Sequence, residues 1–230
     1  MLIVLEGIDK SGKGAQARLL LEALTDPKET HPYLNPLLIK FPRYDTAIGK
    51  MLRSHLRGYW EVLPNQLGID KAKSEDMPGI FYDIEDLNID AMAFQALMLA
   101  DKALAAPDIE DRQRVKLTTI LDRYWQSALA YGVADGLDEE ALFRMHKVLP
   151  TANINILVDV PVDVAMARGR DGVPDEPDRY ERDYEKLQRV RNNYLRLWAG
   201  EMSKTWSWHV IDGTRPPAEI HDRIMKLVPR

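Results

Sequence analysis

A short apolar run and the glycine-rich loop that follows it are the residues that most constrain the fold. Residues 2–6, LIVLE, have the aliphatic composition of a strand that is covered on both faces. Residues 7–14, GIDKSGKG, carry glycines that let backbone N–H groups turn inward around an anion. Residues 13–24 have a helical composition. Strand, glycine-rich loop and helix in this order predict a phosphate-binding loop.

Strand-like and helix-like segments alternate along the rest of the chain. The further predicted strands are residues 37–42, 115–122, 154–161 and 207–213. The further predicted helices are residues 45–58, 90–106, 181–198 and 216–228, with another beginning at 123–132. This alternation predicts an α/β fold with a five-stranded, mostly parallel sheet and helices on both faces. Residues 37–42 are expected to form a buried strand, and residues 59–90, which fit neither pattern, an insertion.

Composition narrows the classes of function. The chain has 230 residues, a net charge of -5 and no cysteine, so it can form neither a disulfide framework nor a thiolate zinc site. The negative charge argues against general attraction to nucleic acid. No apolar run approaches the roughly 18 residues that would span a bilayer. We therefore expect a cytoplasmic protein without a nucleic-acid or membrane partner.

The loop matches most of the pattern G-x-x-x-x-G-K-[ST]. Gly7, Gly12 and Lys13 agree with it, and Lys13 is expected to lie along the β- and γ-phosphates of a nucleotide. Gly14 stands where the pattern has a hydroxyl that binds Mg²⁺. Magnesium keeps several water ligands in most phosphoryl-transfer sites, so water can replace this one. The substitution weakens the metal contact more than the phosphate contact.

Four segments in order resemble the thymidylate kinases, a family of P-loop nucleoside monophosphate kinases: LEGIDKSGKG, FPRYDTAIG, DRYWQSALAYG and DRYERD. The resemblance covers most of the chain except residues 59–90. It implies a P-loop NTPase fold in a single thymidylate-kinase-like domain over residues 1–230, with a mobile lid at about 168–182. It also implies a homodimer that phosphorylates dTMP with ATP and Mg²⁺.

The resemblance assigns the donor side of the site. The residues implied to bind ATP are Gly7, Ser11, Gly12, Lys13, Gly14, Arg168 and Arg170. The residues implied to be catalytic are Lys10, Lys13, Asp122 and Arg123. Lys10 would bridge the two nucleotides during transfer, or would simply be an exposed loop lysine. Asp122 would support Mg²⁺.

The resemblance assigns the acceptor phosphate and sugar to three loop residues. Asp9 is implied to face the sugar, with Tyr44 beside it. Arg43, just past the second predicted strand, is implied to bind the acceptor phosphate through its planar fork. A surface salt bridge is the other interpretation of Arg43.

The segment DRYWQSALAY supplies the rest of the implied acceptor contacts. Arg123 is the second phosphate-binding arginine. Ser127 contacts the base, and Tyr131 crowds the 2′ position of the sugar, which would exclude ribonucleotides. A core role is the other interpretation of Tyr131.

The helix over residues 90–106 departs from the family. Met98 aligns with a phenylalanine that stacks on thymine, and Lys102 with an arginine that binds its carbonyl. Methionine can lie against a base, and lysine can donate to a carbonyl without arginine's fork. Otherwise Met98 is a core residue and Lys102 is solvated. Two rival functions therefore stay open: a kinase for another or modified deoxynucleoside monophosphate, and a nucleotide-binding module without turnover.

Overall fold

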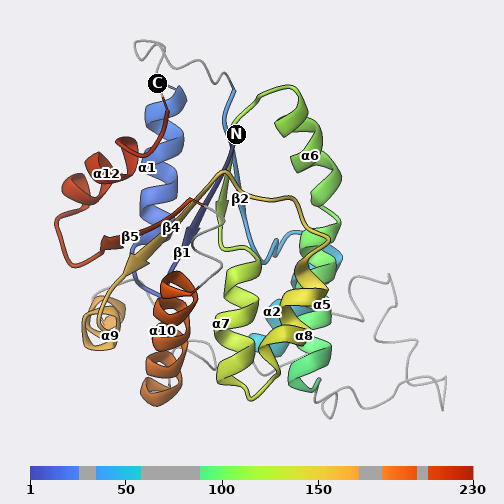
Figure 1. The fold of residues 1–230 in the computed structure, drawn as a ribbon. Coiled ribbons are helices and arrows are strands. Elements are labelled where there is room, and N and C mark those ends of the chain that lie inside the picture. Colours follow the sequence, from blue (N-terminus) through green and yellow to red (C-terminus); the bar gives the residue numbers. More distant parts are fainter. Residues whose placement is uncertain (26–34, 58–88, 171–182, 201–206, 230) are drawn as a thin grey trace, which may run out of the picture.

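The computed structural model describes residues 1–25, 35–57, 89–170, 183–200 and 207–229 (Figure 1). The predicted insertion at 59–90 and the predicted lid at 168–182 therefore lie almost entirely outside the described residues. None of the described helices is long and apolar enough to cross a membrane.

The strands form one five-stranded, entirely parallel sheet, which confirms the predicted fold class. They are β1 (Leu2–Glu6), β2 (Leu37–Lys40), β3 (Thr119–Asp122), β4 (Ile154–Asp159) and β5 (Trp208–Asp212). Their order in the sheet is β2-β3-β1-β4-β5. Because β1 lies between β3 and β4, the loop after β1 opens where the strand order reverses. In open parallel sheets this is the usual place for a ligand.

Helices cover both faces of the sheet, because alternate residues of β1 enter two different cores. Ile3 and Leu5 pack in the core beneath α1 (Lys13–Thr25) and α12 (Pro217–Met225). Leu2 and Val4 pack in the opposite core. That core holds buried side chains of α5 (Ala91–Ala103), α7 (Trp125–Ala134) and α10 (Tyr184–Ala199). It also holds buried side chains of the remaining helices. Figure 1 shows α1 and α12 on one side of the sheet and α5, α7 and α10 on the other.

The remaining helices are α2 (Ala47–Arg57), α6 (Ala106–Arg114), α8 (Glu139–His146) and α9 (Val162–Arg170). Aspartate side chains cap the N-termini of α5, α8 and α10. Asp90, Asp138 and Asp183 each accept a hydrogen bond from the backbone N–H three residues later, at 2.7, 2.8 and 2.9 Å. Each cap satisfies an N–H that has no partner within its helix.

Three details of the sequence-based prediction are wrong. The strand within 37–42 is not buried, because β2 is an edge strand and Leu37 is 40% exposed. The strand within 115–122 begins only at Thr119, because Val115 forms the C-cap of α6. The helix over 90–106 ends at Ala103, and α6 and α8 were not predicted. α6 is highly charged and buries only Ile109, so its apolar pattern is weak.

Candidate active site

Two glycines shape the loop after β1 by adopting backbone angles that other residues rarely reach. Gly7 has φ 148° and Gly12 has φ 95°. A Cβ atom on Gly7 would also lie 2.6 Å from the carbonyl oxygen of Val158, so the loop passes too close to β4 for any side chain. These positions explain why the loop needs glycine where the sequence pattern has it.

Lys13 begins α1 and points back into the loop. Its side chain is buried, and Nζ donates to the carbonyl oxygen of Ile8 at 3.3 Å. The same Nζ lies 3.7 Å from Asp9 Oδ1. Burial lowers the pKa of Lys13, and the neighbouring Arg123 adds to this. Because α1 begins at Lys13, the ammonium group lies at the N-terminus of the helix. A phosphate bound there would meet both this charge and the positive end of the helix dipole.

Asp122, the last residue of β3, lies against Gly14. A Cβ atom on Gly14 would come 3.0 Å from Asp122 Oδ2, so the missing side chain leaves the carboxylate approachable from the loop. Asp122 is 4% exposed, and its Oδ1 has no hydrogen-bond partner among the described residues. An orphaned buried carboxylate oxygen beside a phosphate loop fits a hard cation such as Mg²⁺.

Arg123 follows β3 directly, with a left-handed backbone (φ 71°). Its side chain joins the loop after β1 to α7 and α10. Its guanidinium donates to Gly7 O (3.1 Å), Ser127 Oγ (3.3 Å), Tyr131 OH (3.3 Å), Tyr194 OH (3.4 Å) and Asp9 Oδ1. Arginine's rigid fork suits such a crowded set of acceptors.

Asp9 is the charged partner of both cations. It forms ion pairs with Arg123 and Lys13, and Tyr131 OH donates to its Oδ2 at 2.8 Å. Burial alone would raise the pKa of Asp9, but the charges of Arg123 and Lys13 hold the pKa well below its usual range. Asp9 is therefore ionised at neutral pH and holds the two cations together.

Glu6 and Tyr194 were not predicted from the sequence. Tyr194 accepts a hydrogen bond from Arg123 and donates one to Glu6. Glu6 is fully buried and accepts hydrogen bonds from Tyr124 N (2.7 Å), Ser127 Oγ (2.6 Å) and Tyr194 OH (2.8 Å). Burial raises the pKa of Glu6. The signal for Glu6 was available, because a carboxylate ending an otherwise apolar buried strand needs partners. Tyr194 gave no such signal, because its position fits the apolar face of its helix.

A pocket of about 490 Å³, partly open to solvent, lies between α5 and α7 beside this cluster. Six of the residues predicted to bind the acceptor line it: Asp9, Tyr44, Met98, Arg123, Ser127 and Tyr131. Five lining residues were not predicted: Pro42, Leu56, Phe94, Gln95 and Ala128. The pocket is mostly apolar at its α5 wall and charged where it meets the loop.

Arg43 does not line this pocket, because Asp101 holds it. The Asp101 carboxylate accepts from the backbone N–H of Arg43 at 2.9 Å and from its Nε at 3.0 Å. The carbonyl oxygen of Asp101 accepts from Arg43 Nη2 at 2.6 Å. Asp101 is 1% exposed, so this pair is more sheltered than the surface salt bridge considered from the sequence. Asp101 was not predicted.

Lys102 is fully buried, so the alternative of a solvated lysine is wrong. Its Nζ donates to Met98 O at 3.0 Å and lies 5.8 Å from the centre of the Phe41 ring. It is not among the residues that line the pocket. Burial lowers the pKa of Lys102 to about 8. Met98, by contrast, is both a core residue and part of the pocket wall.

Replacing Lys102 by methionine is expected to stabilise the protein at pH 7, by up to about 3 kcal/mol. The pKa of Lys102 is lower in the folded than in the unfolded chain, so the unfolded state binds the proton more tightly. Wild-type stability therefore rises with pH between about 8 and 10.5, and the advantage of the variant shrinks over that range. Urea unfolding at pH 7, 9 and 10 measures this. Equal stabilities at all three values would contradict the burial of a charged lysine.

Arg168 of α9 connects the loop after β1 to the residue that follows β5. It donates from Nη1 to Ser11 O at 3.1 Å and from Nη2 to Gly213 O at 2.7 Å. Lys10 is partly buried in the loop, with φ 62°. The side chain of Arg170 lies outside the described part of the structure.

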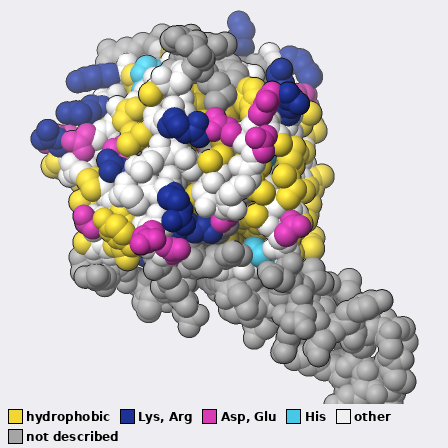
Figure 2. Space-filling view, turned by 60° about the horizontal axis from the view of Figure 1, so that its bottom comes forward, with side chains coloured by type: hydrophobic (Ala, Val, Ile, Leu, Met, Phe, Trp, Pro, Cys, Tyr) yellow, Lys and Arg dark blue, Asp and Glu magenta, His cyan; other side chains and the backbone are white. Residues whose placement is uncertain are grey.

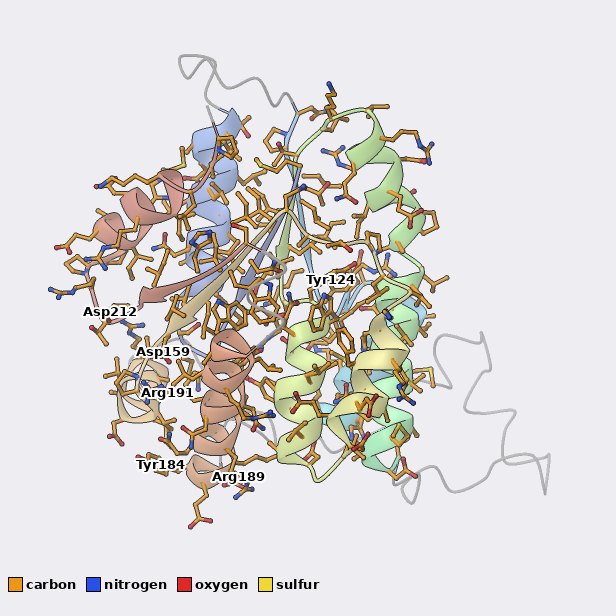
Figure 3. All side chains as sticks on the ribbon, viewed as in Figure 1. Tyr124, Asp159, Tyr184, Arg189, Arg191 and Asp212 are labelled. Carbon is orange, nitrogen blue, oxygen red and sulfur yellow. The ribbon has the colours of Figure 1, made fainter. Side chains whose placement is uncertain are left out.

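An ion pair between Arg191 and Asp159, which the sequence did not suggest, connects α10 to the sheet. Figure 3 shows Arg191 of α10 beside Asp159 at the end of β4, with Asp212 at the end of β5. Arg191 donates to both oxygens of the Asp159 carboxylate at 2.8 Å. The carbonyl oxygen of Asp159 accepts from Gly213 N at 2.8 Å. The pair thereby fixes the loop that Arg168 contacts.

Figure 2 brings the lower end of the molecule in Figure 1 towards the viewer, and basic and acidic side chains lie together near the middle of this face. The described residues contain no group of three or more His, Asp or Glu side chains that could hold a metal ion by themselves.

Comparisons with known proteins agree with this geometry. The thymidylate kinase family model matches residues 83–224. A probable thymidylate kinase of Thermococcus kodakarensis is 34% identical over 99% of this chain and 97% of its own length. The thymidylate kinase of Schizosaccharomyces pombe is 27% identical over 99% of this chain and 90% of its own.

A solved structure has the same fold. It is a thymidylate kinase from Candida albicans, which superposes with a TM-score of 0.69 at 23% identity, over 98% of this chain and 89% of that one. The family model and the archaeal relative together cover both the loop after β1 and the pocket between α5 and α7. The chain therefore belongs to the thymidylate kinase family of ATP-dependent nucleoside monophosphate kinases.

Proposed function

We propose that this kinase transfers the γ-phosphoryl group of ATP to dTMP, giving dTDP and ADP. The observation that supports the proposal most is the position of the α5–α7 pocket. Its charged end contains Asp9 and Arg123, and Lys13 of the phosphate loop lies 3.7 Å from Asp9. A nucleotide in the pocket would bring its phosphate to the phosphates held by the loop.

Positioning and charge stabilisation account for the chemistry. The acceptor phosphate is already a nucleophile, so the protein needs to align the two nucleotides and neutralise the charge of the transferring group. Lys13 and Lys10 would neutralise that charge from the loop, with backbone N–H groups of Gly12 and Gly14 at the phosphates. Arg43 and Arg123 would orient the acceptor phosphate.

Magnesium would be held by Asp122. Its orphaned Oδ1 and the close approach of Gly14 to its Oδ2 support this assignment. When bound, Mg²⁺ would neutralise charge on the ATP phosphates. The absence of a hydroxyl at residue 14 would then be compensated by one more water on the ion.

The walls of the pocket suit a deoxynucleotide. Tyr131, held by Asp9 at 2.8 Å, would crowd the 2′ position of the sugar, with Tyr44 beside it. Met98 and Phe94 offer an apolar surface to the base. Arg168 and Arg170 are proposed to bind ATP on the other side of the loop.

Turnover across acceptors tests the proposed function. ADP release coupled to NADH oxidation should be followed with Mg-ATP and each of dTMP, dUMP, dCMP, dGMP, dAMP and the ribo counterpart of dTMP. The proposal expects the highest kcat/KM on dTMP and little turnover of the ribonucleotide. Preference for another deoxynucleotide would support the kinase activity but contradict dTMP as the acceptor. Binding of ATP without ADP release on any acceptor would favour a non-catalytic nucleotide-binding module.

Replacing Asp101 by asparagine is expected to raise KM for dTMP about tenfold and to leave KM for ATP within twofold of wild type. The substitution keeps the shape of the side chain but removes the charge that fixes Arg43. Steady-state kinetics with each substrate varied measures the split. The control is Asp108→Asn, an exposed aspartate of α6. A rise in both KM values, or in neither, would argue against Asp101 positioning an acceptor-binding arginine.

The family resemblance also leads us to propose a cytoplasmic homodimer. Met92 and Leu104 at the two ends of α5 are exposed apolar side chains that a partner could cover. Sedimentation equilibrium should give twice the chain mass of 26.3 kDa.

A further inference from the structure

The α5 wall of the acceptor pocket contains a polar side chain to which no role has been given. Gln95 is 2% exposed and lines the pocket together with Phe94, Met98 and Ala128. It lies on α5 six residues before Asp101, the residue that holds Arg43. A helix rises 1.5 Å per residue, so Gln95 lies roughly 9 Å along the helix from Asp101. A nucleotide with its phosphate at Arg43 and Arg123 would bring its base towards Gln95.

The carboxamide of Gln95 is not satisfied within the protein. Its Oε1 is buried and has no hydrogen-bond partner among the residues that the structure describes. Buried polar side-chain atoms usually have a partner, and leaving one without costs free energy. A residue of this kind on a pocket wall indicates that a ligand supplies the missing donor.

A glycine lets the amide of Gln95 pack closely against α7. A Cβ atom on Gly132 would lie 3.5 Å from Gln95 Nε2 and 2.6 Å from Cδ1 of Leu142. The neighbouring wall residues Phe94, Met98 and Ala128 offer no donor, so the carboxamide provides the hydrogen-bonding group of this wall. Among the four common bases, thymine alone carries a 5-methyl group, which an apolar wall suits, and its N3–H lies beside a carbonyl.

We infer that Gln95 determines base specificity by accepting a hydrogen bond from N3–H of the thymine ring through Oε1. This inference rests on the proposed function and deepens it, because it states which edge of the acceptor base is recognised. An unprotonated N3, as in cytosine, would leave Oε1 without a donor. Specificity built on an otherwise unpaired polar group is strong because the wrong ligand leaves that group unpaired.

The test compares dTMP with 5-methyl-dCMP, which keeps the ring shape and the 5-methyl group but has an unprotonated N3 and a 4-amino group. Binding of both is measured by isothermal titration calorimetry for the wild type, Gln95→Met and the control Gln113→Met in α6. We expect the wild type and the control to bind dTMP at least tenfold more tightly than 5-methyl-dCMP. Gln95→Met should bind dTMP about tenfold more weakly than the wild type and should lose most of this discrimination.

The thermal midpoint of the free protein separates recognition from a structural role. Methionine removes an unpaired buried acceptor, so the Tm of free Gln95→Met should equal or exceed that of the wild type. The inference is overturned if Gln95→Met retains wild-type affinity and discrimination, or if its Tm falls while discrimination persists. If the wild type turns over dTMP but binds 5-methyl-dCMP equally well, only the inference fails. If the wild type neither binds nor phosphorylates dTMP, both the inference and the proposed function fail.

Discussion

Replacing Lys13 by methionine is expected to lower kcat for phosphoryl transfer about 10³-fold, or ~4 kcal/mol in activation free energy. Methionine keeps the length of the side chain but removes a buried ammonium at the N-terminus of α1. That charge is positioned where the transferring group gains negative charge. Burial already disfavours the free ammonium, so a phosphate would restore its favourable interactions.

Rapid-quench kinetics with saturating ATP and dTMP measure kcat and resolve the chemical step. The control is Lys147→Met, an exposed lysine that follows α8. Circular dichroism should show that both variants remain folded. A folded Lys13→Met protein with kcat within tenfold of wild type would show that the loop does not stabilise the transferring group in the way argued here.

Replacing Arg123 by methionine is expected to reduce kcat/KM for dTMP at least 10³-fold and to destabilise the fold by about 3–5 kcal/mol. The guanidinium is both the proposed phosphate ligand and the main counter-charge of Asp9. Its loss leaves a carboxylate without its strongest partner and three hydroxyl groups without their donor. Kinetics and urea unfolding measure the two losses separately.

The pH dependence of this destabilisation follows from Asp9. Arg123 lowers the pKa of Asp9 in the folded state, so the pair stabilises the protein above the unfolded pKa of 3.8. That contribution is lost as the pH falls through the folded pKa. The stability difference between wild type and Arg123→Met should therefore be full at pH 7 and shrink below about pH 4.

Two further variants serve as controls for the kinetic and unfolding measurements on Arg123→Met. Arg123→Lys keeps the charge without the fork, and it should recover part of the stability but little of kcat/KM. Arg114→Met removes an arginine that is 73% exposed and should change neither quantity. Full activity in Arg123→Lys would mean that charge alone, without bidentate geometry, suffices at this position.

Much of the phosphate side could be predicted from the sequence because it is local. Gly7, Gly12 and Lys13 are close along the chain, and the strand before and the helix after them fix their geometry. The parallel arrangement, which the alternation of strands and helices predicts, brings Asp122 and Arg123 to the same edge of the sheet. The pairing of β3 with β1 was not predicted.

The supporting residues could not be predicted, because their roles depend on packing between distant elements. Asp101 meets Arg43 across 58 positions, and Tyr194 meets Glu6 across 188. Gln95 gave no signal, because a glutamine on an amphipathic helix is ordinary until its burial is known. Lys102 was expected in contact with the base or with solvent, whereas its ammonium is bonded to its own helix.

The most direct test of the central claim is a ³¹P NMR time course of the protein with Mg-ATP and dTMP. Phosphoryl transfer predicts equimolar growth of the ADP and dTDP β-phosphorus signals, with no inorganic phosphate beyond the rate without protein. Growth of inorganic phosphate with unchanged dTMP would mean that the loop hydrolyses ATP instead. An unchanged spectrum from folded, ATP-binding protein would contradict the assignment of dTMP as the acceptor.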